Sequence, residues 1–281
     1  MVKASIILLN YNGKKFLKNC LDSLLIQTYK DFEIIFIDNN SEDKSVSFVK
    51  KNYKDKRLRI LARKTNDGFS GGNNAGYEIS KGKFIILLNN DTIVEKNWLK
   101  ELIEKAESDK KIGIVQSKIL FPDKKINSVG GKFYFPFIAK DKGFLEEDKG
   151  QYEFDSEIEF ACGCSLLIKR EVLEKLGYLF DNKYFIYYED VDLSLRTKKL
   201  GCKVVYAHKS ILIHYGSATM KASPKAVFLS TRNKYFTLKR NKIFYLIPFV
   251  LFWDVLSIIQ NIFKNKEKTK SKLKAIKSAF F

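Results

Sequence analysis

Cysteine is scarce in this sequence, and its scarcity excludes two kinds of small, stapled fold. The four cysteines, Cys20, Cys162, Cys164 and Cys202, are too few in 281 residues for a disulfide scaffold. Cys162 and Cys164 form a close pair, but the sequence lacks the second pair that a structural zinc site needs. Reduced thiols in a cytosolic setting are the simplest interpretation of this pattern.

The N-terminus lacks the features of a secretory leader. Its first apolar run stops at Asn10, well short of the apolar region of a signal peptide, and no small-residue cleavage site follows. We therefore interpret these residues as a first β-strand. Internal repeats are absent as well. The length favours one large domain, or one domain with a sizeable appendage.

Acidic residues are strongly outnumbered by basic ones. The sequence holds 32 Asp and Glu against 51 Lys and Arg, a net charge of +19, while its 45% hydrophobic residues exclude a disordered chain. An excess of this size fits nucleic acid, an anionic membrane surface or a phosphorylated substrate. Composition does not choose among these partners, so the distribution of charge along the chain must do so.

Short apolar runs alternate with segments of helical periodicity in residues 1–120. Residues 14–28, for example, place Leu17, Leu21 and Leu24 on one helix face. Strands that are apolar throughout and alternate with helices predict a mostly parallel, Rossmann-like α/β sheet covered on both faces. The predicted strands span residues 5–9, 32–37, 58–62, 84–88 and 113–120, and the predicted helices span residues 14–28, 42–53, 70–81 and 98–108.

The pattern loosens after residue 120. Residues 121–159 are rich in Gly, Phe, Lys and Asp without a clear period, and we interpret them as an insertion or a long loop. An apolar stretch, residues 160–169, follows. Short helices are then predicted at residues 171–176 and 189–200, and short strands at residues 203–206 and 211–214.

The C-terminal part differs in character, so we divide the chain into a domain of residues 1–220 and a helical segment of residues 221–281. Within this segment, residues 243–263 are almost wholly apolar and are followed by a lysine-dominated tail. Their length is about enough to span ~30 Å of hydrocarbon. However, Asp254, Ser257 and Asn261 recur at helical spacing and make one polar stripe, which favours an amphipathic helix lying in a membrane interface or packed on the protein.

The concentration of basic residues in this segment fits attraction to anionic lipid better than a nucleic-acid groove. We therefore expect an anionic membrane surface as a partner and no nucleic acid. The spanning alternative for residues 243–263 stays open at this point.

Polar residues follow the predicted strands at the edge where ligands bind in parallel sheets. Asp38 could accept hydrogen bonds from a nucleobase or ribose, or could cap the next helix. Tyr11 could stack on a base, or could be a half-buried aromatic at the rim. The segment from Asn66 to Gly76 is rich in glycine at a strand-to-helix turn, but it matches neither a P-loop nor a G-x-G-x-x-G fingerprint.

Asp91 follows the predicted strand 84–88 directly, where a divalent ion could bridge its carboxylate to a diphosphate. The alternative is that Asp91 or Thr92 caps the next helix. His214 ends another apolar strand, and its imidazole could complete a metal site with Asp91, although a lone histidine is also commonly structural. We interpret His208 as structural.

Acidic residues crowd the start of the helix predicted at residues 189–200. Asp192 and Arg196 stand four apart and are expected to pair on one face. This leaves Glu189 and Asp190 to point out of the helix start, where one carboxylate could act as a general base. The alternative is a solvated acidic helix start.

Six ordered motifs together make the sequence resemble the inverting glycosyltransferases of family 2, which have the GT-A fold, and within them the rhamnosyl- and galactofuranosyltransferase-like branch. The resemblance runs from about Ser5 to Ser217. The motifs are Ser5-Ile-Ile-Leu-Leu-Asn-Tyr-Asn, Ile37-Asp-Asn-Asn-Ser, the segment from Asn66 to Gly76, Leu88-Asn-Asn-Asp-Thr, Tyr188-Glu-Asp-Val-Asp-Leu and His214.

The resemblance implies a role for each matching residue. Asp91 and His214 would ligate Mn²⁺ or Mg²⁺, and the departure from the family's D-x-D motif is Asn89, where many relatives have aspartate. Asp190 would be the catalytic base, with Glu189 helping to orient the acceptor. The implied nucleotide-binding residues are Asn10, Tyr11, Asp38, Asn66, Gly68, Asn73, Asn89, Asn90 and Asp91.

As a function, the resemblance implies transfer of a sugar from a UDP- or dTDP-linked donor to a hydroxyl of a lipid-linked or polysaccharide acceptor, in the synthesis of cell-surface glycans. Residues 121–159 would lie on the acceptor side, and the protein would be cytoplasmic and peripheral on the inner face of the cell membrane. The alternatives are a non-catalytic, basic membrane-surface module and a sugar-nucleotide pyrophosphorylase. The latter would need a glycine- and arginine-rich loop where Asn10-Tyr-Asn-Gly stands.

Overall fold

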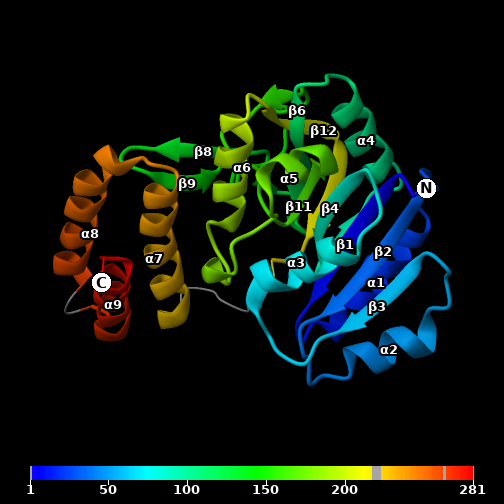
Figure 1. Ribbon diagram of the computed structural model, residues 1–281, viewed down its shortest axis with the longest axis horizontal. Coiled ribbons are helices and arrows are strands. Elements are labelled where there is room, and N and C mark those ends of the chain that lie inside the picture. Colours follow the sequence, from blue (N-terminus) through cyan, green and yellow to red (C-terminus); the bar gives the residue numbers. More distant parts are fainter. Residues whose placement is uncertain (1, 217–222, 262–263, 281) are drawn as a thin grey trace.

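The computed structural model describes residues 2–216, 223–261 and 264–280. Its main sheet has ten strands in the order β10-β12-β6-β11-β4-β1-β2-β3, with β5 added to β12 and β7 to β6 (Figure 1). The strands are β1 (Ala4–Asn10), β2 (Phe32–Asp38), β3 (Leu58–Ala62), β4 (Phe84–Asn89), β5 (Thr92–Val94), β6 (Ile112–Leu120), β7 (Ile126–Ser128), β10 (Ser156–Glu157), β11 (Ser165–Lys169) and β12 (Lys203–His214). β1 to β4 pair in parallel, as do β6 and β12, whereas β11 runs antiparallel between them. The predicted α/β class is therefore confirmed.

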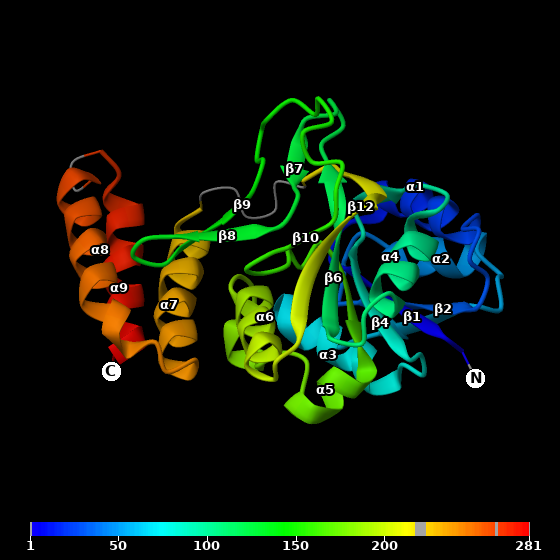
Figure 2. The same cartoon turned by 90° about the horizontal axis from the view of Figure 1, so that it is seen from above.

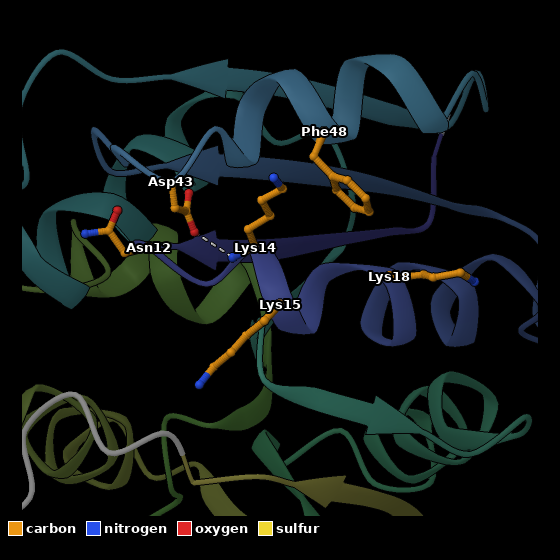
Figure 3. Close-up of a pocket in the computed structure, with 6 residues that line it drawn as sticks. All are labelled: Asn12, Lys14, Lys15, Lys18, Asp43 and Phe48. Atoms are coloured by element: carbon orange, nitrogen blue, oxygen red, sulfur yellow. Dashed lines mark hydrogen bonds between the residues drawn. The ribbon is translucent and has the colours of Figure 1, made fainter.

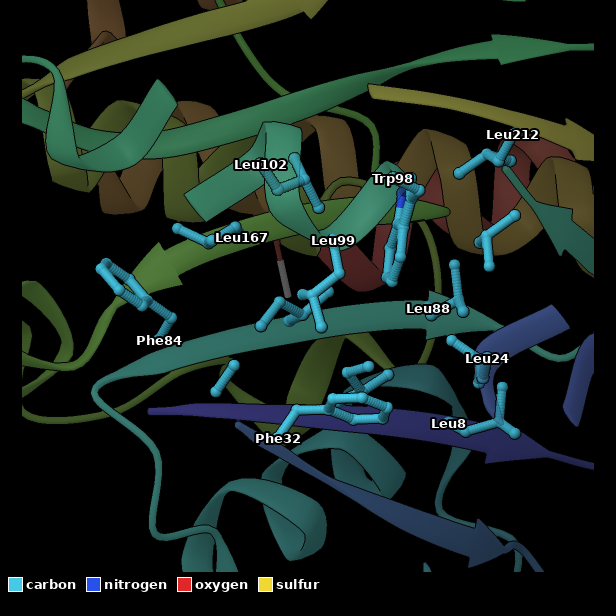
Figure 4. Close-up of a cluster of buried hydrophobic side chains, with 14 of the residues drawn as sticks. Leu8, Leu24, Phe32, Phe84, Leu88, Trp98, Leu99, Leu102, Leu167 and Leu212 are labelled. Atoms are coloured by element: carbon cyan, nitrogen blue, oxygen red, sulfur yellow. The ribbon is translucent and has the colours of Figure 1, made fainter. Parts of the chain in front are cut away.

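Helices cover both faces of the sheet because its strands are apolar on both faces. Ile6 and Leu8 of β1 pack under α1, α2 and α4, while Ile7 packs under α3 on the other face, which α5 and α6 also cover. Trp98 of α4 lies over the first face (Figure 4) and donates from Nε1 to Ser117 Oγ at 2.9 Å. These helices are α1 (Lys14–Leu25), α2 (Ser45–Asn52), α3 (Gly68–Ile79), α4 (Trp98–Glu107), α5 (Arg170–Leu176) and α6 (Glu189–Lys199).

Two parts of the second half differ from the prediction. Residues 121–159 are not one irregular loop: they contain β7, β10 and a separate hairpin of β8 (Gly131–Tyr134) and β9 (Ile138–Asp141). The two short strands predicted at 203–206 and 211–214 are one strand, β12. Its register shifts between Ala207 and Ile211, and this irregularity interrupts the apolar pattern from which a strand is recognised.

The C-terminal helices form a further layer beside α6, and the β8–β9 hairpin extends from the sheet domain to this layer (Figure 2). They are α7 (Pro224–Arg240), α8 (Ile247–Asn261) and α9 (Lys266–Phe280). A small apolar cluster joins them to the sheet domain, with Phe137 of the hairpin region, Val191 of α6, Tyr235 of α7 and Val250 of α8.

The polar stripe of α8 faces inward. Asp254 is buried, pairs with Lys234 and Lys272 at 2.9 Å each, and accepts a hydrogen bond from Tyr235 Oη at 2.8 Å. The polar side of α8 is therefore packed on the protein, and no helix in the described ranges is long and apolar enough to cross a membrane. The side chain of Asn261, residues 262–263 and the predicted boundary at 220/221 lie outside the described residues.

Candidate active site

Polar side chains meet at the carboxyl ends of β1, β2 and β4, as the strand order requires. Asn10 stands opposite Asp38 in the β1–β2 register and donates to its Oδ1 at 2.7 Å, while Asn90 donates to Asn10. Asp38 Oδ2 accepts from the Ser41 amide at 2.9 Å, and α2 begins only after Lys44, so Asp38 does not cap it. These residues form one connected edge.

Tyr11 follows this edge with 44% of its surface exposed, which leaves its ring accessible for stacking.

The glycine-rich segment brings α3 close to β1. A Cβ on Gly72 would lie 2.3 Å from Leu9, and one on Gly76 would lie 2.5 Å from Ile7, so both glycines serve helix–sheet packing. Gly68 has a positive φ of 74°, and Asn66 Oδ1 accepts from its amide at 3.0 Å.

Farther along the same helix, Asn73 is buried and donates to the Phe69 carbonyl of its own helix at 2.9 Å. The turn at Asn66 and Gly68 is joined to the polar edge, since Asn39, just after β2, donates to the Gly68 carbonyl at 2.7 Å.

Asp91 and His214 are brought together although 123 positions separate them in the sequence. His214 pairs with Thr92 across β12 and β5, and its Nε2 lies 3.3 Å from Asp91 Oδ1. α4 begins after Asn97, and β5 intervenes, so neither Asp91 nor Thr92 caps that helix. The predicted pair is therefore formed by strand pairing.

The Asp91 carboxylate and the His214 imidazole are two ligands of the kind that divalent cations bind, but a bound substrate would have to supply the remaining ligands. Asn127 Oδ1 lies 3.2 Å from His214 Nδ1, and in the tautomer with its proton there, the Nε2 lone pair faces the Asp91 carboxylate. Among the described residues, no group of three His, Cys, Asp or Glu side chains could hold a metal ion. The two side chains thus fit Mg²⁺ or Mn²⁺ only with further oxygens, such as those of a diphosphate.

Glu189 and Asp190 begin α6, but they are not a solvated helix start. Glu189 is buried, with Oε2 lacking a hydrogen-bond partner within the described chain, and Asp190 Oδ2 accepts from the Gly163 amide at 2.9 Å. Burial raises the pKa of both carboxyl groups, and the charge of Asp190 adds to the rise at Glu189. Asp192 pairs with Arg196 at 2.7 Å, as predicted.

A short connection joins Asp190 to the metal-site edge. The Gly163 amide binds Asp190, and the carbonyl of the next residue, Cys164, accepts from the amide of Asn89 at 3.0 Å. The base candidate and the end of β4 are therefore joined through the two residues that precede β11.

Three residues of this region escaped the sequence analysis. Asn127, behind His214, and Asp141, whose carboxylate interacts with Asp190 and His214, both lie in the aperiodic insertion. Asn233 of α7 is fully buried, and its amide donates to the carbonyls of Tyr184, Ile186 and Tyr187 at 2.8–2.9 Å. No periodicity or spacing marks any of the three, because each acts through a partner far away in the sequence.

A surface hollow of about 500 Å³ opens beside α1 and α2 (Figure 3). The dashed line in Figure 3 is the hydrogen bond from the Lys14 amide to Asp43, 2.8 Å long. None of the predicted site residues lines this hollow, whose lining is Asn12, Lys14, Lys15, Lys18, Asp43 and Phe48.

Comparisons with known proteins agree on one family. Residues 5–177 match the family model described as Glycosyl transferase family 2. The chain is 30% identical over 228 residues to the O-antigen biosynthesis protein RfbC of Myxococcus xanthus, covering 78% of this chain but only 18% of RfbC. It is 24% identical over 219 residues to the glycosyltransferase GlyG of Streptococcus pneumoniae, covering 75% of this chain and 69% of GlyG.

Solved structures show the same fold. GalNAc-T7 with UDP, GalNAc and Mn²⁺ superposes with a TM-score of 0.66 at 17% identity, covering 85% of this chain and 48% of that one. The mannosyltransferase PcManGT of Pyrobaculum calidifontis, in complex with GDP-Man and Mn²⁺, superposes with a TM-score of 0.63 at 14% identity, covering 99% and 74%. The fold is thus that of GT-A glycosyltransferases.

Proposed function

Because the chain belongs to glycosyl transferase family 2, we propose that it is an inverting, metal-dependent glycosyltransferase. The observation that carries this proposal is that a half-buried carboxylate, Asp190, is tied through Gly163 and Cys164 to the sheet edge that holds the Asp91–His214 pair. One side of the site then binds a nucleoside diphosphate and the other accepts a proton.

In this mechanism Asp190 removes the proton of an acceptor hydroxyl while the oxygen attacks the anomeric carbon from the face opposite the leaving group. Its raised pKa suits this role, because a buried carboxylate binds a proton more tightly than an exposed one. A divalent cation held by Asp91 and His214 would supply positive charge that stabilises the departing diphosphate. A single displacement of this kind inverts the anomeric centre.

The donor side would be formed by the connected edge. We propose that Tyr11 and Asp38 hold the base and ribose, and that Asn66, Gly68 and Asn73 line the pocket wall. Asn10, Asn89 and Asn90 complete the edge. The UDP and GDP-Man bound in GalNAc-T7 and PcManGT support a nucleotide-sugar donor, here taken as UDP- or dTDP-linked.

We further propose that residues 221–281 place the enzyme on the cytoplasmic face of the cell membrane, where a lipid-linked or polysaccharide acceptor is presented. Because Asp254 turns the polar side of α8 inward, the opposite side is apolar and exposed: Phe249, Phe252, Trp253 and Ile259 are each at least 50% exposed. This segment also carries 14 lysines and arginines but two acidic residues, a combination that fits an anionic lipid surface.

Donor hydrolysis tests the catalytic part of the proposal. A panel of UDP-, dTDP- and GDP-sugars is screened for thermal stabilisation of the full chain with Mn²⁺, and the best binder is then assayed for release of nucleoside diphosphate. We expect release that a chelator abolishes and Mn²⁺ or Mg²⁺ restores. A chain that binds no nucleotide sugar, or binds one without ever releasing the diphosphate, would instead be the non-catalytic module.

A further inference from the structure

The β8–β9 hairpin brings a third carboxylate to the catalytic pair. Asp141 ends β9 and stands opposite Gly131 of β8, whose amide donates to the Phe160 carbonyl at 2.8 Å, just ahead of the segment that binds Asp190. The Asp141 carboxylate interacts electrostatically with Asp190 and His214. The hairpin is therefore anchored at the site by its base.

We propose that this hairpin is an acceptor-binding element, and that Asp141 accepts a hydrogen bond from a hydroxyl group of the acceptor sugar beside Asp190. The proposal rests on the glycosyltransferase function proposed above. It concerns a residue to which neither the family match nor the sequence pattern gives a role.

Unpaired oxygens point to the class of ligand. Oδ1 of Asp141 and Oε2 of Glu189 are buried and lack a hydrogen-bond partner within the described residues. A carboxylate oxygen only accepts, so both positions call for donors. No three described His, Cys, Asp or Glu side chains around Asp141 and Glu189 are arranged to hold a metal ion, whereas a sugar offers several hydroxyl donors within a small volume.

The position of the hairpin indicates the acceptor rather than the donor. Its far end carries Phe135, which is 67% exposed and lies 5.4 Å, ring to ring, from Phe249 of α8. Four residues of strand, about 13 Å, separate this end from Asp141, and Figure 2 shows the hairpin running between the two regions. An amphipathic glycolipid would lay its sugar on Asp141 and its apolar part on the aromatic end.

The experiment compares two reactions of the same full-length enzyme. With the donor found above and Mn²⁺, hydrolysis is measured without acceptor, and transfer is measured to octyl glycosides of glucose, galactose, mannose, rhamnose and N-acetylglucosamine. Asp141→Asn keeps the shape of the side chain but replaces one acceptor oxygen by a donor. We expect kcat/KM for the octyl glycoside to fall at least about tenfold more than the rate of donor hydrolysis.

The matched control is Asp123→Asn in the same insertion, where the exposed carboxylate pairs with the Lys125 ammonium at 3.5 Å and accepts from the Lys125 amide at 3.1 Å; it should change neither reaction. Equal loss of hydrolysis and transfer in Asp141→Asn, or loss of neither, would overturn the inference. So would a wild-type enzyme that hydrolyses donor but neither transfers to nor binds any octyl glycoside. A wild type inert towards every donor would overturn the proposed function itself.

Discussion

Burial governs the chemistry of the two carboxylates that begin α6. Asp190 keeps hydrogen bonds from Gly163 and from its own helix start, which favour the ionised form, but desolvation outweighs them and the pKa rises. A carboxylate in this state is a stronger base than an exposed aspartate, yet stays ionised when the pH lies above its raised pKa. The fold thus tunes Asp190 for proton removal.

Replacing Asp190 by asparagine should abolish transfer while leaving donor binding intact. The amide keeps the shape of the side chain but takes up no proton, and loss of a general base lowers rates by about 10²–10⁴-fold. Calorimetric titration with the nucleoside diphosphate should give a Kd within a few-fold of wild type. Transfer close to the wild-type rate would exclude Asp190 as the base.

The raised pKa also predicts a pH dependence of stability. Since the folded Asp190 binds its proton more tightly than the unfolded one, ionisation opposes folding, and Glu189 and Asp141 add like charge nearby. Asp190→Asn should therefore raise the unfolding temperature at pH 8, and the gain should shrink as the pH falls through the raised pKa of Asp190. Thermal unfolding between pH 4 and pH 8 measures this difference, and a gain that grew toward pH 4 would contradict it.

Asp91 and His214 should be equally necessary for metal-dependent nucleotide binding. Asp91→Ala and His214→Ala each remove one of two protein ligands, so the Mn²⁺-dependent part of the binding affinity should fall at least about tenfold in both. His208→Ala is the control. His208 lies on the same strand as His214, but its Nδ1 pairs with Asp155 Oδ1 at 2.6 Å. If calorimetry showed unchanged binding in either site variant, the shared metal site would be refuted.

At the scale of elements, the apolar pattern of the sequence predicts those strands and helices whose formation depends on neighbouring residues. β1, β2 and β4 are mostly apolar because both faces of the sheet are covered, and their parallel pairing brings Asn10, Asp38 and Asn89 at the carboxyl ends to one edge. The β8–β9 hairpin and the orientation of α8 were beyond this reasoning. The former depends on pairing within an aperiodic segment, and the latter on ion pairs between Asp254 and two other helices.

Asn233 shows how α7 holds the catalytic loop. Tyr187 and Tyr188 have positive φ, a backbone conformation that costs free energy. The side-chain amide of Asn233 donates to the carbonyls of Tyr184, Ile186 and Tyr187. Asn233→Leu keeps the volume but leaves these acceptors unpaired, at about 1–3 kcal/mol for a buried group. We expect a lower unfolding temperature and a kcat reduced more than the affinity for the nucleotide.

The control for this variant is Asn52→Leu, since Asn52 lies on the surface of α2 and bonds the Phe48 carbonyl of its own helix. It should leave both stability and kcat almost unchanged. If Asn233→Leu unfolded earlier but kept a wild-type kcat, then Asn233 would stabilise the fold without positioning Glu189 and Asp190.

At the scale of the whole molecule, the helical layer and the active site are parts of one arrangement. α7 fixes the loop before α6, α8 contacts the end of the β8–β9 hairpin, and α9 packs on α7 and contributes Lys272 to the inward-facing Asp254. A surface formed by α8 is therefore linked by packed elements to Asp190. Binding of that surface to a membrane would hold the catalytic edge at a fixed distance from lipid-borne sugars.

The apolar side of α8 should be necessary for this membrane binding. Phe252 and Trp253 are 60% and 53% exposed, so changing both to serine removes little internal packing but forfeits about 1.5–3 kcal/mol of burial for each ring that enters the lipid. Co-sedimentation with phosphatidylglycerol-containing vesicles should fall at least tenfold, whereas Phe154→Ser, at a 53% exposed ring in the insertion, should have no effect.

Wild-type binding should weaken with added salt and in pure phosphatidylcholine, because the exposed lysines Lys266, Lys270, Lys274 and Lys277 of α9 provide the electrostatic part. Vesicle binding that survives the double change would show that α8 does not face the membrane.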